Sequence, residues 1–234
     1  MTGPVVAPGA HRDALVAQQA AFLALTRTAP PDAGVPGCPG WTVRDVVAHL
    51  TGVHRWAAAL SRTAPGAPVP PDEDPSPADD PAAAYAAAAR ALLAALDEDP
   101  DRPCTTLAGA GRAGDWYRRQ AHETLVHTWD LADAAGAPRT GPADRVADAV
   151  EEVLDTLLPR QVRLGRTAAV EVGVELLGSR RWRLGTGPVV ATVAGPDTEL
   201  LRLLWGRTTS TGTALVVAGD RGRAAQVLAA ALTP

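Results

Sequence analysis

The sequence contains no lysine, isoleucine or asparagine, and it has only one phenylalanine and two tyrosines beside six tryptophans. All 22 of its basic residues are therefore arginine. The residue types that are missing or rare share AT-rich codons. Their scarcity indicates a GC-rich genome, and so describes the source of the protein rather than its fold.

Cysteine is scarce too. Cys38 and Cys104 are far apart and form no Cys-x-x-Cys pair, which argues against a disulfide framework and a cysteine-rich zinc site. The net charge of −4 argues against a nucleic-acid binder, which normally has a basic surface. The most apolar stretch, residues 82–96, is mostly alanine and contains Arg90, so it does not predict a membrane span. Residues 1–10 show no signal-peptide pattern. We expect a soluble, cytoplasmic protein without nucleic-acid or membrane partners.

The first 140 residues have the apolar spacing and capping residues of helices. A helix beginning at Thr42 is indicated by Thr-x-x-Asp, an acidic variant of the capping box. Residues 62–81, rich in proline and acidic residues, predict a long exposed loop. The predicted helices span residues 9–28, 42–60, 82–97 and 115–135. We therefore predict an antiparallel four-helix bundle over residues 1–140.

After residue 140 the pattern changes to a mixture of helices and short strands. Alternating valines predict a strand over residues 168–177. Further strands are expected at 182–184, 189–193 and 214–218, and helices at 142–158, 197–205 and 220–232. The predicted fold class is mainly α, with the bundle followed by a small α+β domain over residues 141–234.

The fourth predicted helix contains the run His-Glu-Thr-Leu-Val-His at residues 122–127. Positions four apart on a helix differ by about 40° and five apart by about 140°. Glu123 and His127 can therefore bind one ion together, with Asp130 on the same face, while His122 points elsewhere. The zinc-peptidase motif His-Glu-x-x-His would need histidine where this chain has Val126. Asp130 fits a partner for a cation, or an acceptor for the second N–H of a metal-binding imidazole.

The second predicted helix carries His49 and His54, also five apart, so at most one of them can join Glu123 and His127. His49 lies on the apolar side of its helix, where a core histidine is an equally good interpretation. A His-Glu-His set leaves tetrahedral zinc one open position. Water there would make a hydrolase, whereas a thiol there would become a strong nucleophile. Geometry alone leaves this choice open. Trp41, which precedes the helix, is expected to pack within the bundle.

Residues 38–50 (Cys-Pro-Gly-Trp-Thr-Val-Arg-Asp-Val-Val-Ala-His-Leu), followed by 52–56 (Gly-Val-His-Arg-Trp), resemble the N-terminal signature of the mycothiol-dependent maleylpyruvate isomerase family. Residues 118–130 resemble its second signature, and residues 201–207 with 219–220 resemble its C-terminal module. The resemblance covers nearly the whole chain.

This resemblance implies a DinB-like bundle joined to a domain akin to sterol-carrier modules. It implies a divalent metal, usually zinc, held by His49, Glu123 and His127. It also implies that mycothiol, a small thiol of actinobacteria, supplies the group at the open position. An actinobacterial source fits the GC-rich composition.

Further site residues follow from the same resemblance. Arg207 is the candidate for binding a substrate carboxylate, although an arginine ending a leucine-rich helix can simply be solvated. Arg118 and Arg119 are candidates for contacting mycothiol, and exposed arginines near a helix start are the alternative. His54 or Asp130 is a candidate for moving protons or orienting ligands.

The leading hypothesis is a metal-dependent enzyme that activates the thiol of mycothiol for addition to a small electrophile, as an isomerase or as an S-transferase. One alternative is a metal-dependent hydrolase with bound water. Another is a non-catalytic protein stabilised by its metal. The sequence leaves open the electrophile, the native metal and whether the protein is a monomer or a dimer.

Overall fold

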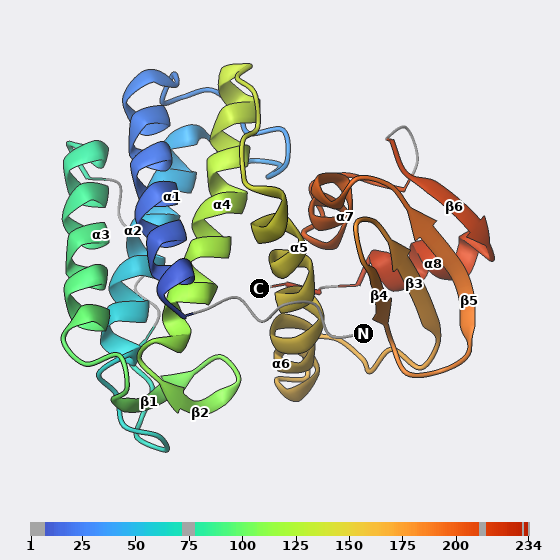
Figure 1. Cartoon of the computed structure of the whole chain (residues 1–234). Helices are drawn as coiled ribbons and strands as arrows, with labels where there is room; N and C mark the ends of the chain where they lie inside the picture. The colour runs from blue at the N-terminus through green and yellow to red at the C-terminus, as the bar shows by residue number, and fades with distance from the viewer. Residues whose placement is uncertain (1–7, 72–77, 211–213, 231, 234) are drawn as a thin grey trace. The chain divides into compact units, whose positions relative to one another are not determined.

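The computed structural model of the chain describes all residues except 1–7, 72–77, 211–213, 231 and 234. It divides into two units, Met1–Thr140 and Gly141–Pro234. The first unit is a bundle of the helices α1 (Pro8–Thr28), α2 (Val43–Leu60), α3 (Pro81–Asp97) and α4 (Asp115–Ala135) (Figure 1). The predicted fold class, a helical bundle followed by a smaller α+β part, is confirmed.

Polar contacts at one end of the bundle fix the directions of its helices. Arg12, near the start of α1, donates hydrogen bonds of 2.8 and 2.6 Å to the carboxylate of Asp97 at the end of α3. Tyr117, near the start of α4, donates to the same carboxylate. Arg102, just after α3, donates to the carbonyl of Ser61, just after α2, at 3.1 Å. The helices therefore run up, down, down and up.

This order explains the long segment between α2 and α3. Because both helices end at the same end of the bundle, the chain must return along the bundle before α3 begins, and bundles with such crossovers have long connections. The indole N–H of Trp56 donates to the carbonyl of Pro70 at 3.2 Å, which ties part of the crossover to α2. The predicted loop over 62–81 lies partly outside the described residues, because 72–77 are not described.

The start of α2 follows its sequence signature. The backbone N–H of Thr42 donates to the Asp45 carboxylate at 2.8 Å, and the Asp45 N–H donates back to the Thr42 hydroxyl at 3.4 Å. This is a complete capping box. It fixes the first turn of α2, and with it the register of the apolar face that buries Val46 and Leu50.

A hairpin before α4 was not predicted. Strands β1 (Pro103–Thr106) and β2 (Gly109–Arg112) pair antiparallel. Each strand has four residues, too few for a clear alternation of apolar and polar positions. The indole N–H of Trp116 in α4 donates to the carbonyl of Thr105 at 3.1 Å, so the hairpin is held against the first turn of α4.

The second unit begins with a longer helical segment than predicted. The expected helix over 142–158 appears as α5 (Ala143–Glu152), a π-helical turn η1 (Val153–Leu157) and α6 (Leu158–Arg163). Pro159 lacks a backbone N–H, and its ring interferes with regular α-helical hydrogen bonding one turn earlier. The wider π turn accommodates the proline, and the helical path continues beyond it.

The sheet of the second unit has the described strand order β4-β3-β5-β6. Strand β3 (Gly173–Leu177) pairs antiparallel with β4 (Arg181–Leu184) and parallel with β5 (Val189–Ala194). Strand β5 pairs antiparallel with β6 (Val216–Gly219). Helix α7 (Asp197–Leu204) contacts α5, and α8 (Arg221–Leu228) contacts β5 (Figure 1).

The prediction of a strand over 168–177 is wrong in its first half, because only Gly173–Leu177 pairs. The valine alternation extends back to Val170, but β5 begins only at Val189, so the ladder has no partner for the earlier residues among those described. The carbonyl of Val170 instead accepts from the N–H of Thr186 at 3.1 Å. A strand needs a neighbour of matching length, and alternation alone does not supply one.

The last strand and helix are also shifted from their predicted bounds. The strand predicted at 214–218 is β6 at Val216–Gly219. The helix predicted at 220–232 is α8 at Arg221–Leu228, with Asp220 as its N-cap, whose side chain accepts from the N–H of Arg223 at 3.0 Å. Residue 231 lies outside the described residues.

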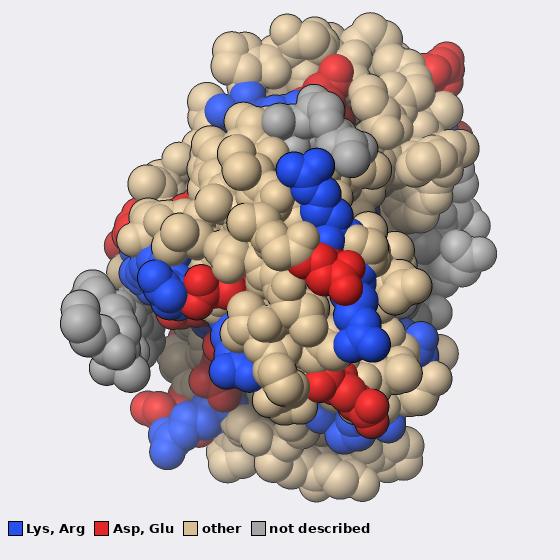
Figure 2. Space-filling view, turned by 90° about the vertical axis from the view of Figure 1, so that its right-hand side faces the viewer, with Lys and Arg blue, Asp and Glu red and all other residues tan. Residues whose placement is uncertain are grey.

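On the face shown in Figure 2, arginine side chains lie beside aspartate and glutamate side chains and do not gather into one basic patch. Strands β3 and β4 carry one close pair of opposite charges, because Nη1 of Arg181 lies 2.8 Å from Oε1 of Glu175. Among the described residues, no helix combines the length and the apolar character that crossing a bilayer requires.

Candidate metal centre

Helix α4 carries many buried polar side chains. Burying such groups is costly unless they are hydrogen-bonded, paired or bound to a metal. Its buried polar residues are Arg119, Gln120, His122, Glu123, Thr124, His127, Thr128 and Asp130. Each threonine is satisfied locally, because its hydroxyl donates to the carbonyl one turn earlier at 2.6 Å. The charged groups and imidazoles require partners from other positions.

Three of the sequence-predicted residues converge between α2 and α4. Oε1 of Glu123 lies 3.6 Å from Nε2 of His49 and 3.2 Å from Nε2 of His127. The two imidazole centroids are 5.0 Å apart. One possible ligand atom from each residue lies within 4.8 Å of the other two. The structure thus brings together His49, Glu123 and His127, a group we call the His-Glu-His cluster.

The spacing of these atoms suits a metal ion. Zinc binds nitrogen and oxygen ligands at about 2.0–2.2 Å in a tetrahedron, so two of its ligand atoms lie about 3.3–3.6 Å apart. The distances of 3.2 and 3.6 Å from Glu123 Oε1 to the two Nε2 atoms match this spacing. Two imidazoles and one carboxylate are also a usual donor set for catalytic zinc.

His127 gives a second reason to expect a cation. Its Nε2 faces Glu123 at 3.2 Å, and its Nδ1 faces Oδ2 of Asp130 at 2.9 Å. A neutral imidazole has a single N–H and can donate to only one of these carboxylates. The other nitrogen–oxygen contact needs either a second proton on the ring or a cation between the two atoms. If Nδ1–H donates to Asp130, Nε2 is available to bind a metal.

Asp130 is therefore placed to accept a hydrogen bond from Nδ1–H of His127. Its two predicted roles, as a partner for a cation or as an acceptor for a metal-binding imidazole, stay predictions. Its carboxylate is also 3.6 Å from Sγ of Cys38, in the segment before α2. Asp130 is buried, so these contacts compensate for the removal of its charge from water. The contacts fix the ring plane of His127.

Arg119 is buried beside Glu123, one turn earlier on α4. Its Nη2 donates to Oε2 of Glu123, while Oε1 of the same carboxylate faces the two imidazoles. The alternative of an exposed arginine near a helix start does not apply, because Arg119 is buried. The spacing of Arg119 and Glu123, four residues apart on one helix, is the sequence signal that could have revealed this pair.

His49 is the most exposed member of the cluster, because its side chain is 34% exposed whereas Glu123 and His127 are buried. The ring of Trp41 stands edge-on to His49 with centroids 5.3 Å apart. The expectation that Trp41 packs within the bundle is wrong, because Trp41 is 38% exposed. It forms a wall beside the accessible imidazole.

His54 lies outside the cluster, in the interior of the bundle. Its Nδ1 is 2.8 Å from Oε1 of Gln120, and its Nε2 is 3.4 Å from both Nε2 of Gln19 and the hydroxyl of Tyr85. Burial lowers the pKa of this imidazole to about 4, against the opposing effect of the hydrogen bond with Gln120. These contacts favour a neutral core histidine, and its role in proton transfer stays a prediction.

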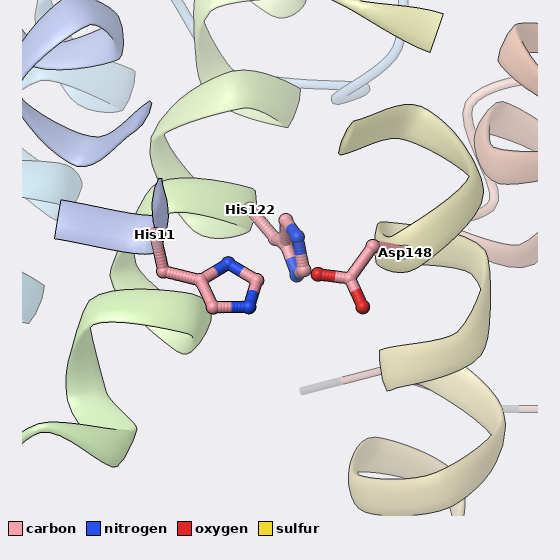
Figure 3. A group of neighbouring side chains, drawn as sticks. All are labelled: His11, His122 and Asp148. Atoms are coloured by element: carbon pink, nitrogen blue, oxygen red, sulfur yellow. The ribbon is translucent and has the colours of Figure 1, made fainter. Parts of the chain in front are cut away.

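His122 points away from His127, as helical geometry predicts. Its ring stands edge to face with that of His11 in α1, with centroids 6.1 Å apart and an angle of 89° between the planes (Figure 3). Both histidines are buried. Asp148, also labelled in Figure 3, belongs to α5 of the second unit. The two histidines of the 122–127 run therefore have different neighbours: His11 for His122, and His49 with Glu123 for His127.

Comparison with known proteins assigns the chain to a family. It matches the family model of the mycothiol maleylpyruvate isomerase N-terminal domain over residues 12–132, more than half its length. It belongs to the mycothiol maleylpyruvate isomerase family. A second match, to the C-terminal domain of these isomerases, covers residues 144–226. The resemblance of its sequence signatures to this family is confirmed.

Solved structures show the same fold. The crystal structure of a mycothiol-dependent maleylpyruvate isomerase is similar with a TM-score of 0.72 at 13% identity, over 93% of this chain and 96% of that one. A histidine-to-alanine mutant of a mycothiol-dependent maleylpyruvate isomerase gives a TM-score of 0.71, with the same identity and coverage. A search of curated protein sequences gives no match.

Arg118 and Arg207 are the two remaining predicted site residues. Arg118 is partly buried on α4, beside Arg119. Arg207 lies in the second unit, just after α7, where it donates to the carbonyl of Trp205 at 2.9 Å and stacks on its ring at 5.6 Å. The roles of Arg118 in binding mycothiol and of Arg207 in binding a carboxylate stay predictions.

Proposed function

We propose that the protein is a metal-dependent enzyme that uses mycothiol to isomerise a small unsaturated substrate of the maleylpyruvate type. The observation that carries the proposal is the convergence of His49, Glu123 and His127 with the spacing of metal ligands, in a member of this family. The names of the similar solved structures support mycothiol as the thiol.

A divalent ion bound to the His-Glu-His cluster, most simply zinc, would lower the pKa of a thiol at the remaining position. The chain's own residues hold the donors. Asp130 holds the ring of His127 through Nδ1, so that Nε2 faces the site. Arg119 holds one oxygen of Glu123, so that the other faces the imidazoles. Burial of these groups excludes water from their side of the site and strengthens their interactions.

The thiol and the substrate would approach past His49 and Trp41, since both are partly exposed while the other two donors are buried. A thiolate bound there would supply reversible addition to one carbon of the cis double bond, with the electron pair of the broken π bond taken up by the conjugated carbonyl oxygen. Rotation about the resulting single bond, followed by return of that electron pair and loss of the thiolate, would give the trans isomer. The thiol is regenerated, and no oxidant or reductant is consumed.

The direct test is to incubate the untagged protein with mycothiol and a panel of small electrophiles that includes maleylpyruvate. Isomers and thiol adducts would be followed by chromatography and mass spectrometry. We expect conversion of a cis to a trans isomer that requires both the protein and mycothiol. His127→Ala serves as the inactive control, and 2-mercaptoethanol tests whether the thiol is specific.

The products distinguish the proposed reaction from its alternatives. Accumulation of a stable mycothiol adduct would identify an S-transferase. Hydrolysis of an ester or amide without any thiol would identify a hydrolase. Absence of conversion with every electrophile, in protein that carries its metal, would contradict the proposal.

A further inference from the structure

The His-Glu-His cluster lies in a group of charges that are withdrawn from water. The side chains of Arg119 and Glu123 are 7% and 10% exposed, and those of His127 and Asp130 are 4% and 2% exposed. Charges in such surroundings interact more strongly than on the surface, because little solvent screens them. The net charge of these groups and a bound metal ion therefore affects whether the metal binds an anionic or a neutral exogenous ligand more tightly.

Arg119 changes that net charge. The two carboxylates of Glu123 and Asp130 and the guanidinium of Arg119 together carry one negative charge when the imidazoles are neutral. A divalent ion at the cluster would leave the group with one positive charge. A single anion at the remaining position would then bring it to neutrality, whereas a neutral ligand would leave a positive charge buried.

Arg119 is also in the right place to act through Glu123. Its Nη2 is bonded to Oε2, and Oε1 of that carboxylate faces both imidazoles. The guanidinium therefore adds its charge to the site through the oxygen of Glu123 opposite the one that faces the imidazoles. Arginine suits this role because it stays protonated when buried.

We propose that Arg119 is a positioning residue that makes the metal centre select an anion, rather than a neutral molecule, as its exogenous ligand. This inference rests on the proposed metal-dependent function and adds to it a reason why a thiol would bind in its deprotonated form. It also replaces the predicted role of Arg119 in direct contact with mycothiol by a role through Glu123.

The experiment compares an anionic with a neutral ligand of the metal. Protein loaded with Co²⁺ would be titrated with azide and, separately, with imidazole, and binding followed by the visible absorption of the cobalt. The quantity compared between proteins is the ratio of the two dissociation constants, because a change that weakens both ligands equally leaves this ratio unchanged. The variants are Arg119→Gln, which removes the charge, and Arg119→Lys, which keeps it. Arg90→Gln, at an exposed position on α3, is the matched surface control.

We expect Arg119→Gln to weaken azide relative to imidazole by about tenfold or more, because a buried charge is lost beside the ligand. Arg119→Lys should stay within about threefold of the unchanged protein, because the charge remains. Arg90→Gln should match the unchanged protein. Equal ratios in Arg119→Gln and the unchanged protein would overturn the inference.

Two further measurements keep the test decisive. Thermal unfolding and cobalt content show whether each variant is folded and loaded. If Arg119→Gln takes up no cobalt, the unchanged protein decides the question, because a preference for imidazole over azide there would overturn the inference. Failure of the unchanged protein to bind any divalent ion would instead contradict the proposed function itself.

Discussion

Oε1 of Glu123 lies 3.2 Å from Nε2 of His127, one helical turn further along α4. The same imidazole presents its Nδ1 to Asp130 at 2.9 Å. One ring is therefore held between two buried carboxylates, an arrangement that a neutral imidazole cannot satisfy alone. Either a second proton on the ring or a metal ion at Nε2 would resolve the conflict, and the proposed metal is the basis for the first prediction below.

Asp130→Asn should weaken metal binding without abolishing it. Asparagine keeps an oxygen that can accept from Nδ1–H of His127 but loses the negative charge that makes the ring a better ligand. Changes of this kind lower metal affinity by about 10- to 100-fold. The measurement is a competition with a chromogenic chelator. Asp133→Asn is the control, because Asp133 lies on the same helix and pairs with Arg139 instead. Equal affinities in the two variants would contradict the role of Asp130.

The buried imidazole of His54 should make the bundle less stable in mild acid. Burial lowers its pKa to about 4, below the ordinary value of 6.5, so the unfolded chain takes up a proton more readily than the folded one. The stabilising contribution is complete above pH 6.5 and is lost as the pH falls toward 4. The loss reaches roughly 2 kcal/mol at pH 5 and roughly 3 kcal/mol at pH 4.

Urea unfolding at several pH values between 7 and 4 checks this prediction, with a chelator present so that loss of metal does not contribute. His54→Gln removes the titrating group. Between pH 7 and 4 its free energy of unfolding should therefore fall by roughly 3 kcal/mol less than that of the unchanged protein. Parallel pH profiles for the variant and the unchanged protein would show that His54 is not the group responsible.

Thr42→Ala should lower the free energy of unfolding by about 1 kcal/mol, because it removes the hydroxyl of the capping box at the start of α2. Thr28→Ala is a suitable comparison. The Thr28 hydroxyl is exposed and bonds only within its own helix among the contacts described, at 3.2 Å to Ala24. Denaturant unfolding of both variants gives the difference. An equally small effect in both would show that the cap contributes little.

Much of the helical unit could be predicted from local signals. The capping box at Thr42 and the glycine at position 136, which ends α4 with a φ of 64°, mark helix boundaries through the backbone chemistry of a few residues. The directions of the helices could not be predicted in this way. They depend on contacts between distant segments, such as Arg12 with Asp97.

The strands were less predictable, because strand pairing depends on the neighbouring chain. Val170 and Val172 precede Gly173 with the same alternation as Val174, yet only residues from Gly173 onward pair. The β1–β2 hairpin has strands too short to carry a periodic signal. The helix predicted over 142–158 shows a similar limit, since the helical path continues past Pro159 to Arg163 through a π-helical turn.

At the site, helical geometry correctly separated His127 from His122, and the family resemblance supplied the choice of His49 over His54. The geometry of α4 alone shows which of its side chains share a face. Which histidine of α2 approaches that face depends on how α2 is rotated about its own axis. The rotation of α2 against α4 leaves His54 in the core with Gln120. The contact between Cys38 and Asp130 joins segments 92 residues apart and has no local signal.

The central claim is that His49, Glu123 and His127 hold one divalent ion, and elemental analysis of protein purified without a histidine tag tests it most directly. We predict close to one divalent ion per chain in the unchanged protein and almost none in His127→Ala, with far-UV circular dichroism confirming that both are folded. Equal metal content in the two proteins, or none in either, would contradict the claim.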